Sequence, residues 1–366
     1  MPANRAAARI IKWPTGWAFR IFTRVCGRGY SEDVAATAIS ILIKQKGGLQ
    51  VKTIPLEAPK AAAVRRSVVW KRIQRSYELY LFLLPTLVYF LVFHYGPLYG
   101  LQIAFKNFIA VKGIWGSPWA GFEHFERFFH SPQFAIVLKN TLLLNLYELA
   151  VAFPVPIVMA LLLNQIAHAR FKKWVQTVTY APHFISAVVI VGMLFVFLSP
   201  RNGLLNELIK LLGGNPVYFM ARPEWFKTIF VFSGLWQNAG WSMIIYLAAL
   251  TGVSPELHEA AIMDGANKYQ RIWHIDLPSI MPTVVILLIL NVGNFMTVGF
   301  EKVYLMQNPL NADASEVIQT YVYKSGLLSA QYSYSAAVGL FNAGVNFILL
   351  ITVNGLAKRL KQASLW

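Results

Sequence analysis

The chain has 366 residues, of which 56% are hydrophobic and only 13% charged, and its mean hydropathy is +0.49. Because a soluble domain carries about twice that share of charge, the composition excludes a water-soluble globular protein. A single cysteine, Cys26, excludes a disulfide framework within the chain, and the formal net charge of +17 points to an anionic partner, either nucleic acid or a membrane face.

Residues 1–76 are predicted to form a basic cytoplasmic extension. The first 77 residues hold 15 Lys or Arg against three acids. Aromatic side chains such as Trp13 and Trp17 lie among the basic ones, which suits an interfacial anchor on anionic lipid and equally a partly disordered extension. The apolar run at 34–43 is too short to cross a bilayer and is predicted to be a short helix.

Six later runs reach the length of about 20 apolar residues that a membrane-spanning helix needs. They are predicted at 79–105, 142–165, 174–198, 226–250, 282–306 and 334–356. The second contains Glu148, which costs about 3 kcal/mol to insert, but its many Leu, Ile, Phe and Val side chains return roughly 0.3–0.6 kcal/mol each. This helix should therefore insert with Glu148 turned from lipid, and Pro154 and Pro156 predict a kink in it.

The basic residues set the orientation. Besides the extension, they gather in the loop after the second span, with Arg170, Lys172 and Lys173, and in the C-terminal tail. With six spans these segments share one side, which the positive-inside rule places in the cytoplasm together with both termini. Membrane topology thus explains the charge without nucleic acid.

The loop at about 251–281 breaks the apolar pattern. Ser254 and Pro255 are typical of a helix start, and Gly265 permits a turn that other residues resist. A second apolar set follows at helical spacing, and Leu277-Pro278 is predicted to close it. We expect two short helices with a bend at the membrane surface, a form that any cytoplasmic loop can also take.

The spacing of this loop resembles the EAA signature of ABC importer membrane subunits. The matching residues are Glu259, Ala260, Ala261, Gly265, Ile275, Leu277 and Pro278, and Asp264 lies among them as a charge that could meet a partner. In that family the segment is the coupling helix, which docks on the ATPase subunit. The resemblance implies that these residues transmit force and perform no chemistry.

Other stretches resemble carbohydrate-importer permeases of the maltose and glycerol-phosphate group, on the polysaccharide branch that includes the alginate importer. They include "GSPWAGFEHFERFF", "YAPHFISAVVI" and "WQNAGWSMIIYLAALTGVSPELHEAAIMDGA". The likeness covers 77–361 and implies an all-α integral membrane protein: a six-span type I permease core in the bacterial inner membrane, with a tail at 362–366.

The resemblance also implies the assembly: a second permease subunit in a heterodimer, an ATPase subunit dimer, an extracytoplasmic solute-binding protein and an oligosaccharide substrate. The sequence has no G-x-x-x-x-G-K-[ST] loop, so ATP and Mg²⁺ are expected on the ATPase subunits, and the chain itself should be neither an enzyme nor a cofactor carrier. Its seven histidines show no spacing typical of a metal site.

Polar and aromatic residues within the fourth and fifth spans are the candidates for the substrate pathway. They are Trp236, Gln237, Asn238, Trp241, Asn291 and Asn294. Such groups either line a pathway or join helices by hydrogen bonds. The resemblance favours the pathway, and Trp236 and Asn294 match the sugar-binding positions of maltose-type permeases most directly. Glu148, Glu301 and Asn346 are expected to be structural.

The predicted function is import of an oligosaccharide by alternating access, driven by the partner ATPase. The sequence does not name the sugar. Acidic fragments such as those of alginate are one candidate, although no arginine or lysine stands in the candidate site. The alternative is an ion-coupled secondary sugar transporter, which should show inverted repeats and paired broken helices that the sequence does not display.

Overall fold

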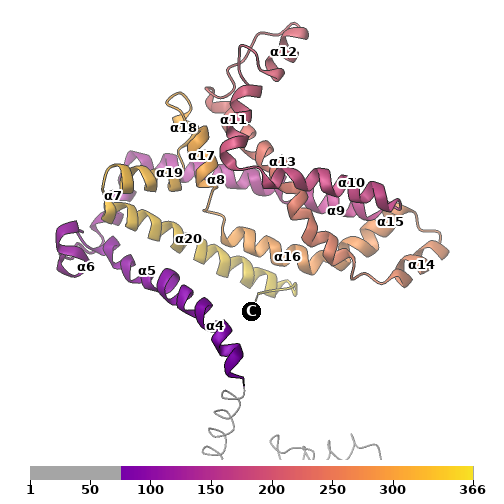
Figure 1. Cartoon of the computed structure of the whole chain (residues 1–366), viewed down its shortest axis with the longest axis horizontal. Helices are drawn as coiled ribbons and strands as arrows, with labels where there is room; N and C mark the ends of the chain where they lie inside the picture. The colour runs from indigo at the N-terminus through magenta and orange to yellow at the C-terminus, as the bar shows by residue number, and fades with distance from the viewer. Residues whose placement is uncertain (1–75, 366) are drawn as a thin grey trace, which may run out of the picture. The chain divides into compact units, whose positions relative to one another are not determined.

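A computed structural model of the protein describes residues 76–365 (Figure 1). Predictions for Cys26, the helix at 34–43 and nearly all of the extension lie outside the described residues. Within 76–365 the chain forms helices and no β-strand, apart from one isolated bridge between Lys106 and Trp119. Its internal contacts divide the chain into a unit that ends at Leu83 and a second that begins at Leu84. The predicted all-α architecture is confirmed.

The first predicted span is a continuous helical stretch of 29 residues, Tyr77–Phe105. It consists of α4 (Tyr77–Tyr89), the π-turn η1 (Phe90–Tyr95), α5 (Gly96–Leu98) and the 3-10 turn η2 (Tyr99–Phe105). The π-turn ends at Tyr95, two residues before Pro97. Because proline lacks an N–H and its ring crowds the carbonyl four residues back, a wider turn at this point relieves the conflict.

Short helices lead to the second span: η3 (Ala110–Lys112), α6 (Gly113–Gly116) and α7 (Glu123–Phe129). The span consists of α8 (Pro132–Ala152) and α9 (Pro154–Asn164). At the position of the predicted kink, one residue, Phe153, separates the two helices, which together count as one span of 33 residues. The helix begins ten residues before the predicted 142, because Ser131 caps it: the Ser131 Oγ accepts the Phe134 N–H at 3.2 Å.

The third span, predicted at 174–198, is a bent pair of helical segments. They are α10 (Ala169–Tyr180) with the 3-10 turn η4 (Ala181–Phe184), and α11 (Ala187–Phe197). The chain bends by 98° between them. Pro182 has no N–H to continue the first helix, and Ser186 caps the next by accepting the Val189 N–H at 3.4 Å. The third predicted span is therefore a bent pair of helical segments and not one continuous helix.

Beyond α12 (Leu204–Leu211), the fourth predicted span is the helix α13 (Pro223–Leu250). Its 28 residues measure about 42 Å, enough to cross a bilayer. Among the described residues, four helices are both long and apolar enough to do so, or five if the bent pair counts as one. The helix α13 is not one of these, because Gln237 and Asn238 lower the hydropathy in its middle.

The fifth span is displaced from its predicted place at 282–306. The helical stretch runs from Lys268 to Gly293 and includes α15 (Lys268–Arg271), the π-turn η5 (Ile272–Asp276) and α16 (Leu277–Gly293). A short helix, α14 (Pro255–Met263), precedes it. The chain leaves α16 at Asn294, so the later part of the predicted span belongs to the separate helix α17 (Phe300–Met306).

The last span is confirmed, with wider bounds, as α20 (Tyr332–Arg359). Between α17 and α20 lie α18 (Ala312–Ser315), α19 (Ile318–Tyr323) and the π-turn η6 (Lys324–Leu328). Within the second unit, α16 and α20 pack side by side (Figure 1).

The helix α13 lies at the centre of the packing. One buried cluster joins it to α8, α11 and α17 through residues such as Leu144, Val191 and Phe230, and another joins it to α9 and α16 through Ala160 and Met243. A third cluster lies between α7, α8, α19 and α20. Large apolar side chains also cover outward faces, as at the start of the first span, which suits a chain surrounded by lipid and partner helices.

Candidate coupling segment and substrate pathway

The loop after α13 starts its helix where the sequence predicts. Ser254 has extended backbone angles, φ −62° and ψ 128°, and Pro255 is the first residue of α14. The Ser254 side chain makes no capping hydrogen bond. The start of the helix therefore depends on Pro255, whose fixed φ suits the first helical position and whose missing N–H costs nothing there.

The helix ends at Gly265 by a Schellman motif. The Ala266 N–H donates to the Ala261 carbonyl at 2.8 Å, and the Gly265 N–H donates to the Ile262 carbonyl at 3.0 Å. Gly265 has a φ of +80°, as predicted, and a Cβ built on it would meet nothing within 4 Å. Glycine is required here by backbone conformation and not by space.

A capping box, which the sequence analysis missed, starts the next helix. The Asn267 N–H donates to the Gln270 Oε1 at 2.8 Å, and the Gln270 N–H donates to the Asn267 Oδ1 at 2.9 Å. The spacing Asn-x-x-Gln could have revealed it. The prediction that Leu277-Pro278 closes a separate second helix is wrong. The helix continues through η5 into α16, since the wide π-turn accommodates Pro278.

The predicted coupling residues occupy two sides of this segment. Ala261, Asp264, Gly265 and Ile275 line a groove of about 300 Å³, while Glu259 and Ala260 are exposed outside it. Leu277 and Pro278 are the first residues of α16. Large apolar side chains are also left exposed, and they are Leu257, Ile262, Met263, Tyr269 and Trp273. A polar groove beside exposed apolar side chains is typical of a protein docking surface.

The predicted pathway residues converge in part. Asn238, Trp241, Asn291 and Asn294 line one cavity of about 400 Å³, which Glu148 also lines. The cavity lies between α8, α9, α13 and α16. The amide nitrogens of Asn291 and Asn294 donate to carbonyls of their own helix, at 2.8 and 3.2 Å. These contacts fix the direction of each amide group.

His183 contacts two of the residues that line this cavity, although the sequence analysis did not single it out. Its Nδ1 lies 3.0 Å from the Asn238 Oδ1, and its ring stacks on Trp241. The turn η4, which packs against α13, places it there. Gly240 permits this approach, since a Cβ on it would lie 2.1 Å from the Thr179 carbonyl oxygen. The quoted stretch "YAPHFISAVVI" contained the residue, but no spacing in it indicates a partner 58 residues away.

Gln237 and Trp236 point elsewhere. The Gln237 Nε2 donates to the Ile185 carbonyl at 2.9 Å and so holds the bend between α10 and α11. Trp236 lines a separate, apolar groove of about 340 Å³ with residues of α11 such as Met193 and Phe197. On a helix, residues two apart lie on opposite sides, so Trp236 and Asn238 cannot share one cavity wall.

Among the described residues, no arginine or lysine lines the cavity of Asn291 and Asn294, but a buried lysine lines a second cavity that shares Glu148 and Asn238 with it. Lys302, from α17, is 8% exposed and lines a cavity with Glu148, Gln237 and Asn238. Its Nζ donates to the Phe230 carbonyl at 2.9 Å and lies 4.7 Å from the centre of the Phe230 ring. Asn346, expected to be structural, accepts the Met296 N–H at 2.7 Å and so ties α20 to the chain after α16.

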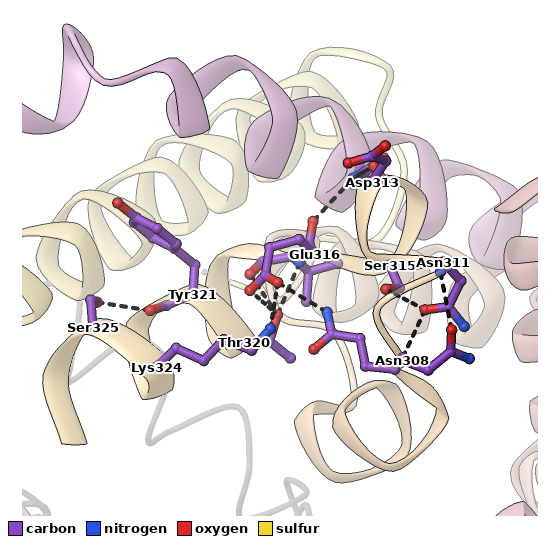
Figure 2. Close-up of polar contacts among 12 residues, drawn as sticks. Asn308, Asn311, Asp313, Ser315, Glu316, Thr320, Tyr321, Lys324 and Ser325 are labelled. Carbon is purple, nitrogen blue, oxygen red and sulfur yellow. Dashed lines mark hydrogen bonds and ion pairs between the residues drawn. The ribbon is translucent and has the colours of Figure 1, made fainter. Parts of the chain in front are cut away.

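Figure 2 shows a polar cluster in the connection between α17 and α19. Asn311 is its buried centre: the side-chain amide donates to the Met220 and Met306 carbonyls, and Oδ1 accepts the Ser315 hydroxyl at 3.0 Å. Glu316 accepts from Thr320 at 3.1 Å and from Lys324 at 2.5 Å. These bonds order the connection.

A tyrosine pair follows the cluster. Burial raises the pKa of the Tyr321 hydroxyl, and its contact with the Tyr334 hydroxyl at 2.8 Å raises it further.

In the described part of the chain, no group of three or more His, Cys, Asp or Glu side chains is placed to hold a metal ion.

Comparison with known proteins identifies relatives of the whole core. The chain is 47% identical over 322 residues to the polygalacturonan/rhamnogalacturonan transport system permease protein YteP of Bacillus subtilis, covering 86% of this chain and 100% of the relative. It is 29% identical over 285 residues to the arabinooligosaccharides transport system permease protein AraP of Bacillus subtilis, covering 77% of this chain and 87% of the relative.

A solved structure gives the same result. The fold matches, with a TM-score of 0.75 and 40% identity, a chain of the crystal structure of a bacterial alginate ABC transporter in complex with an alginate pentasaccharide-bound periplasmic protein. The match covers 81% of this chain and 99% of that chain. Residues 140–362 match the family described as the inner membrane component of binding-protein-dependent transport systems. The chain therefore belongs to this family, as a membrane permease component that is not itself an enzyme.

Proposed function

We propose that the chain is one permease subunit of an ABC importer that moves acidic oligosaccharides into the cytoplasm by alternating access. The observation that carries the proposal is the cavity lined by Asn238, Trp241, Asn291 and Asn294. Amide groups beside a flat aromatic surface suit a sugar ring, because hydroxyls need hydrogen bonds and the ring's C–H face needs an apolar partner.

The acidic class is supported by two relatives. One transports polygalacturonan or rhamnogalacturonan by its name, and the structural neighbour belongs to a transporter of alginate, described as an acidic polysaccharide. Neutral amides donate to carboxylates as well as to hydroxyls. Lys302 adds a cation beside the cavity, which offsets the carboxylate of Glu148 that lines the same space.

The energy would come from partner subunits. In the proposed assembly, an ATPase dimer binds ATP and Mg²⁺ and presses on α14 and α15, while a second permease completes the pathway and a solute-binding protein delivers sugar from outside. The groove lined by Asp264, Gly265 and Ile275, with the exposed Met263 and Trp273, supports the docking of the ATPase here.

The same proposal fixes the topology and the division of the chain. Both termini face the cytoplasm, residues 1–76 form a basic extension, and 77–361 form the permease core with a short tail at 362–366. The basic loop that contains Arg170, Lys172 and Lys173 would face the same side as the coupling segment.

The test is uptake by the complex reconstituted in vesicles with its ATPase, second permease and binding protein. Labelled oligogalacturonate and alginate fragments should enter in an ATP-dependent manner, and the loaded binding protein should stimulate ATP hydrolysis. Carboxyl-reduced oligosaccharides of equal length serve as the matched neutral control. Uptake of the reduced sugars at the rate of the acidic ones would overturn the acidic class, and uptake driven by an ion gradient without ATP would overturn the importer assignment.

A further inference from the structure

We propose that Asp276 is a positioning residue that fixes the coupling helix α14 to the membrane core through His258 and Gln165. The inference rests on the proposed function, because it assumes that α14 receives the movement of the ATPase. It concerns a different step, the passage of that movement from the docking surface to the pathway.

Asp276 stands out by its burial. Its exposed fraction is 0%, and no other Asp or Glu among the described residues is buried. A carboxylate removed from water is strongly destabilising unless charged or hydrogen-bonding groups compensate it. The groups that surround Asp276 are therefore expected to stay with it when the segment moves.

Those groups come from separate elements. The Gln165 Nε2, at the end of α9, donates to the Asp276 Oδ2 at 2.8 Å. The His258 Nε2, from the middle of α14, lies 3.2 Å from the other carboxylate oxygen, Oδ1. Asp276 itself is the last residue of the π-turn that leads into α16. One side chain thus joins three helical elements.

The contact between His258 and Asp276 is the polar contact that joins α14 to the helical stretch leading into α16. Among the described residues, no other hydrogen bond or ion pair joins a residue of α14 to another long helix. The Asp276 Oδ1 accepts no hydrogen bond among the described residues, and the His258 Nε2 at 3.2 Å is the polar atom recorded against it. Displacing α14 without α16 would therefore leave a buried carboxylate oxygen uncompensated, and the two are expected to move as one body.

The consequence reaches the pathway through α16. This helix begins directly after Asp276 and carries Asn291, which lines the cavity with Asn294. Gln165 joins the same carboxylate to α9, whose neighbour α13 carries Trp241. A push on α14 would be delivered through Asp276 to two walls of the cavity.

The experiment uses the complete transporter in vesicles, with Asp276→Asn and His258→Gln as variants. Asp276→Asn keeps the shape and removes the charge, whereas His258→Gln changes a partly exposed residue and should fold in any case. The matched control is Glu256→Gln, an exposed residue of the same helix. The measurements are co-purification of the ATPase, its hydrolysis with loaded binding protein, and sugar moved per ATP.

Both variants should bind the ATPase as the parent does but move about tenfold less sugar per ATP, the scale expected when a buried charge loses its partner. Glu256→Gln should behave as the parent. The exchanged pair, His258→Asp with Asp276→His, should recover part of the loss, which a general folding defect would not. If all variants couple as the parent does, the inference is overturned while the proposed function stands. If the loaded binding protein does not stimulate even the parent complex, both are overturned.

Discussion

His183 lies flat against Trp241, with ring centroids 4.5 Å apart and an interplanar angle of 5°. The histidine also reaches Asn238, so one side chain of the turn η4 contacts two side chains of α13 that line the cavity. In this arrangement the histidine covers one face of the Trp241 indole, and a sugar would contact the other face.

Trp241→Ala should therefore reduce sugar uptake by roughly tenfold to a hundredfold, as the loss of about 1–3 kcal/mol of aromatic contact implies. Trp236→Ala removes an equal side chain from the separate apolar groove and is the matched control. Initial uptake rates in vesicles measure the difference. Equal losses in both variants would assign the effect to packing and not to the cavity.

Gly265→Val should uncouple the transporter without disturbing insertion. A β-branched residue at a φ of +80° costs roughly 1–2 kcal/mol or more and would redirect the start of α15. Gly265→Asn should be far milder, because asparagine tolerates left-handed backbone. The readout is ATP hydrolysis in response to loaded binding protein. Normal stimulation of Gly265→Val would contradict the role assigned to this turn.

Glu259→Lys should weaken binding of the ATPase. The residue is exposed on α14, and reversing its charge would place it against the basic surface that we infer on the partner. The matched control is Glu224→Lys, an exposed acid in the first turn of α13. Co-purification at two salt concentrations measures the effect, which should diminish as salt screens the charges. A loss that does not depend on salt would point to misfolding.

Gly240→Ala should destabilise the contact between α10 and α13, since the new methyl group would lie 2.1 Å from the Thr179 carbonyl oxygen. Overpacking of this kind costs about 1–3 kcal/mol. Gly344→Ala, on α20, meets nothing within 4 Å and serves as the control. Thermal unfolding in detergent should separate the two variants, and an unchanged midpoint for Gly240→Ala would refute the close approach.

Asn311→Leu should loosen the connection between α17 and α19. Asn311 is 1% exposed, and its loss leaves the Met306 carbonyl without this donor, at about 1–3 kcal/mol, whereas the Met220 carbonyl keeps the Asn308 amide as a donor. Asn202→Leu changes an exposed asparagine and should have little effect. Protease resistance of the connection is the measurement, and parent-like resistance of Asn311→Leu would show that the cluster is not needed for order.

Structural features that depend only on residues close together in the chain could be predicted from the sequence. Pro255 starts α14 and Gly265 ends it because each acts on its own backbone, and such effects are visible in a short stretch. The six apolar runs likewise mark where helices lie. The start of the fifth span at Lys268 was missed because hydropathy sees polar side chains there, whereas the capping box of Asn267 sets the boundary.

Features that depend on distant residues escaped prediction. His183 reaches Trp241 because the turn η4 packs against α13, and Lys302 lines a cavity with Gln237 because α17 is separate from the fifth span. Trp236 and Asn238 are two positions apart and belong to different cavities, since the neighbours of α13 decide what each face meets. Residue type indicated which side chains could line the pathway, but the packing of neighbouring helices determines which of them line the same cavity.

The π-turn η5 determines the rotation of α16 about its own axis. An α-helix turns by about 100° per residue. The number of residues in Ile272–Asp276 therefore determines the direction in which each later side chain leaves the helix axis. Deleting one residue from this turn would rotate all of α16 by about 100° relative to α14 and swing Asn291 off the cavity wall. The proposed coupling segment thus also sets the orientation of Asn291, a residue of the proposed sugar pathway.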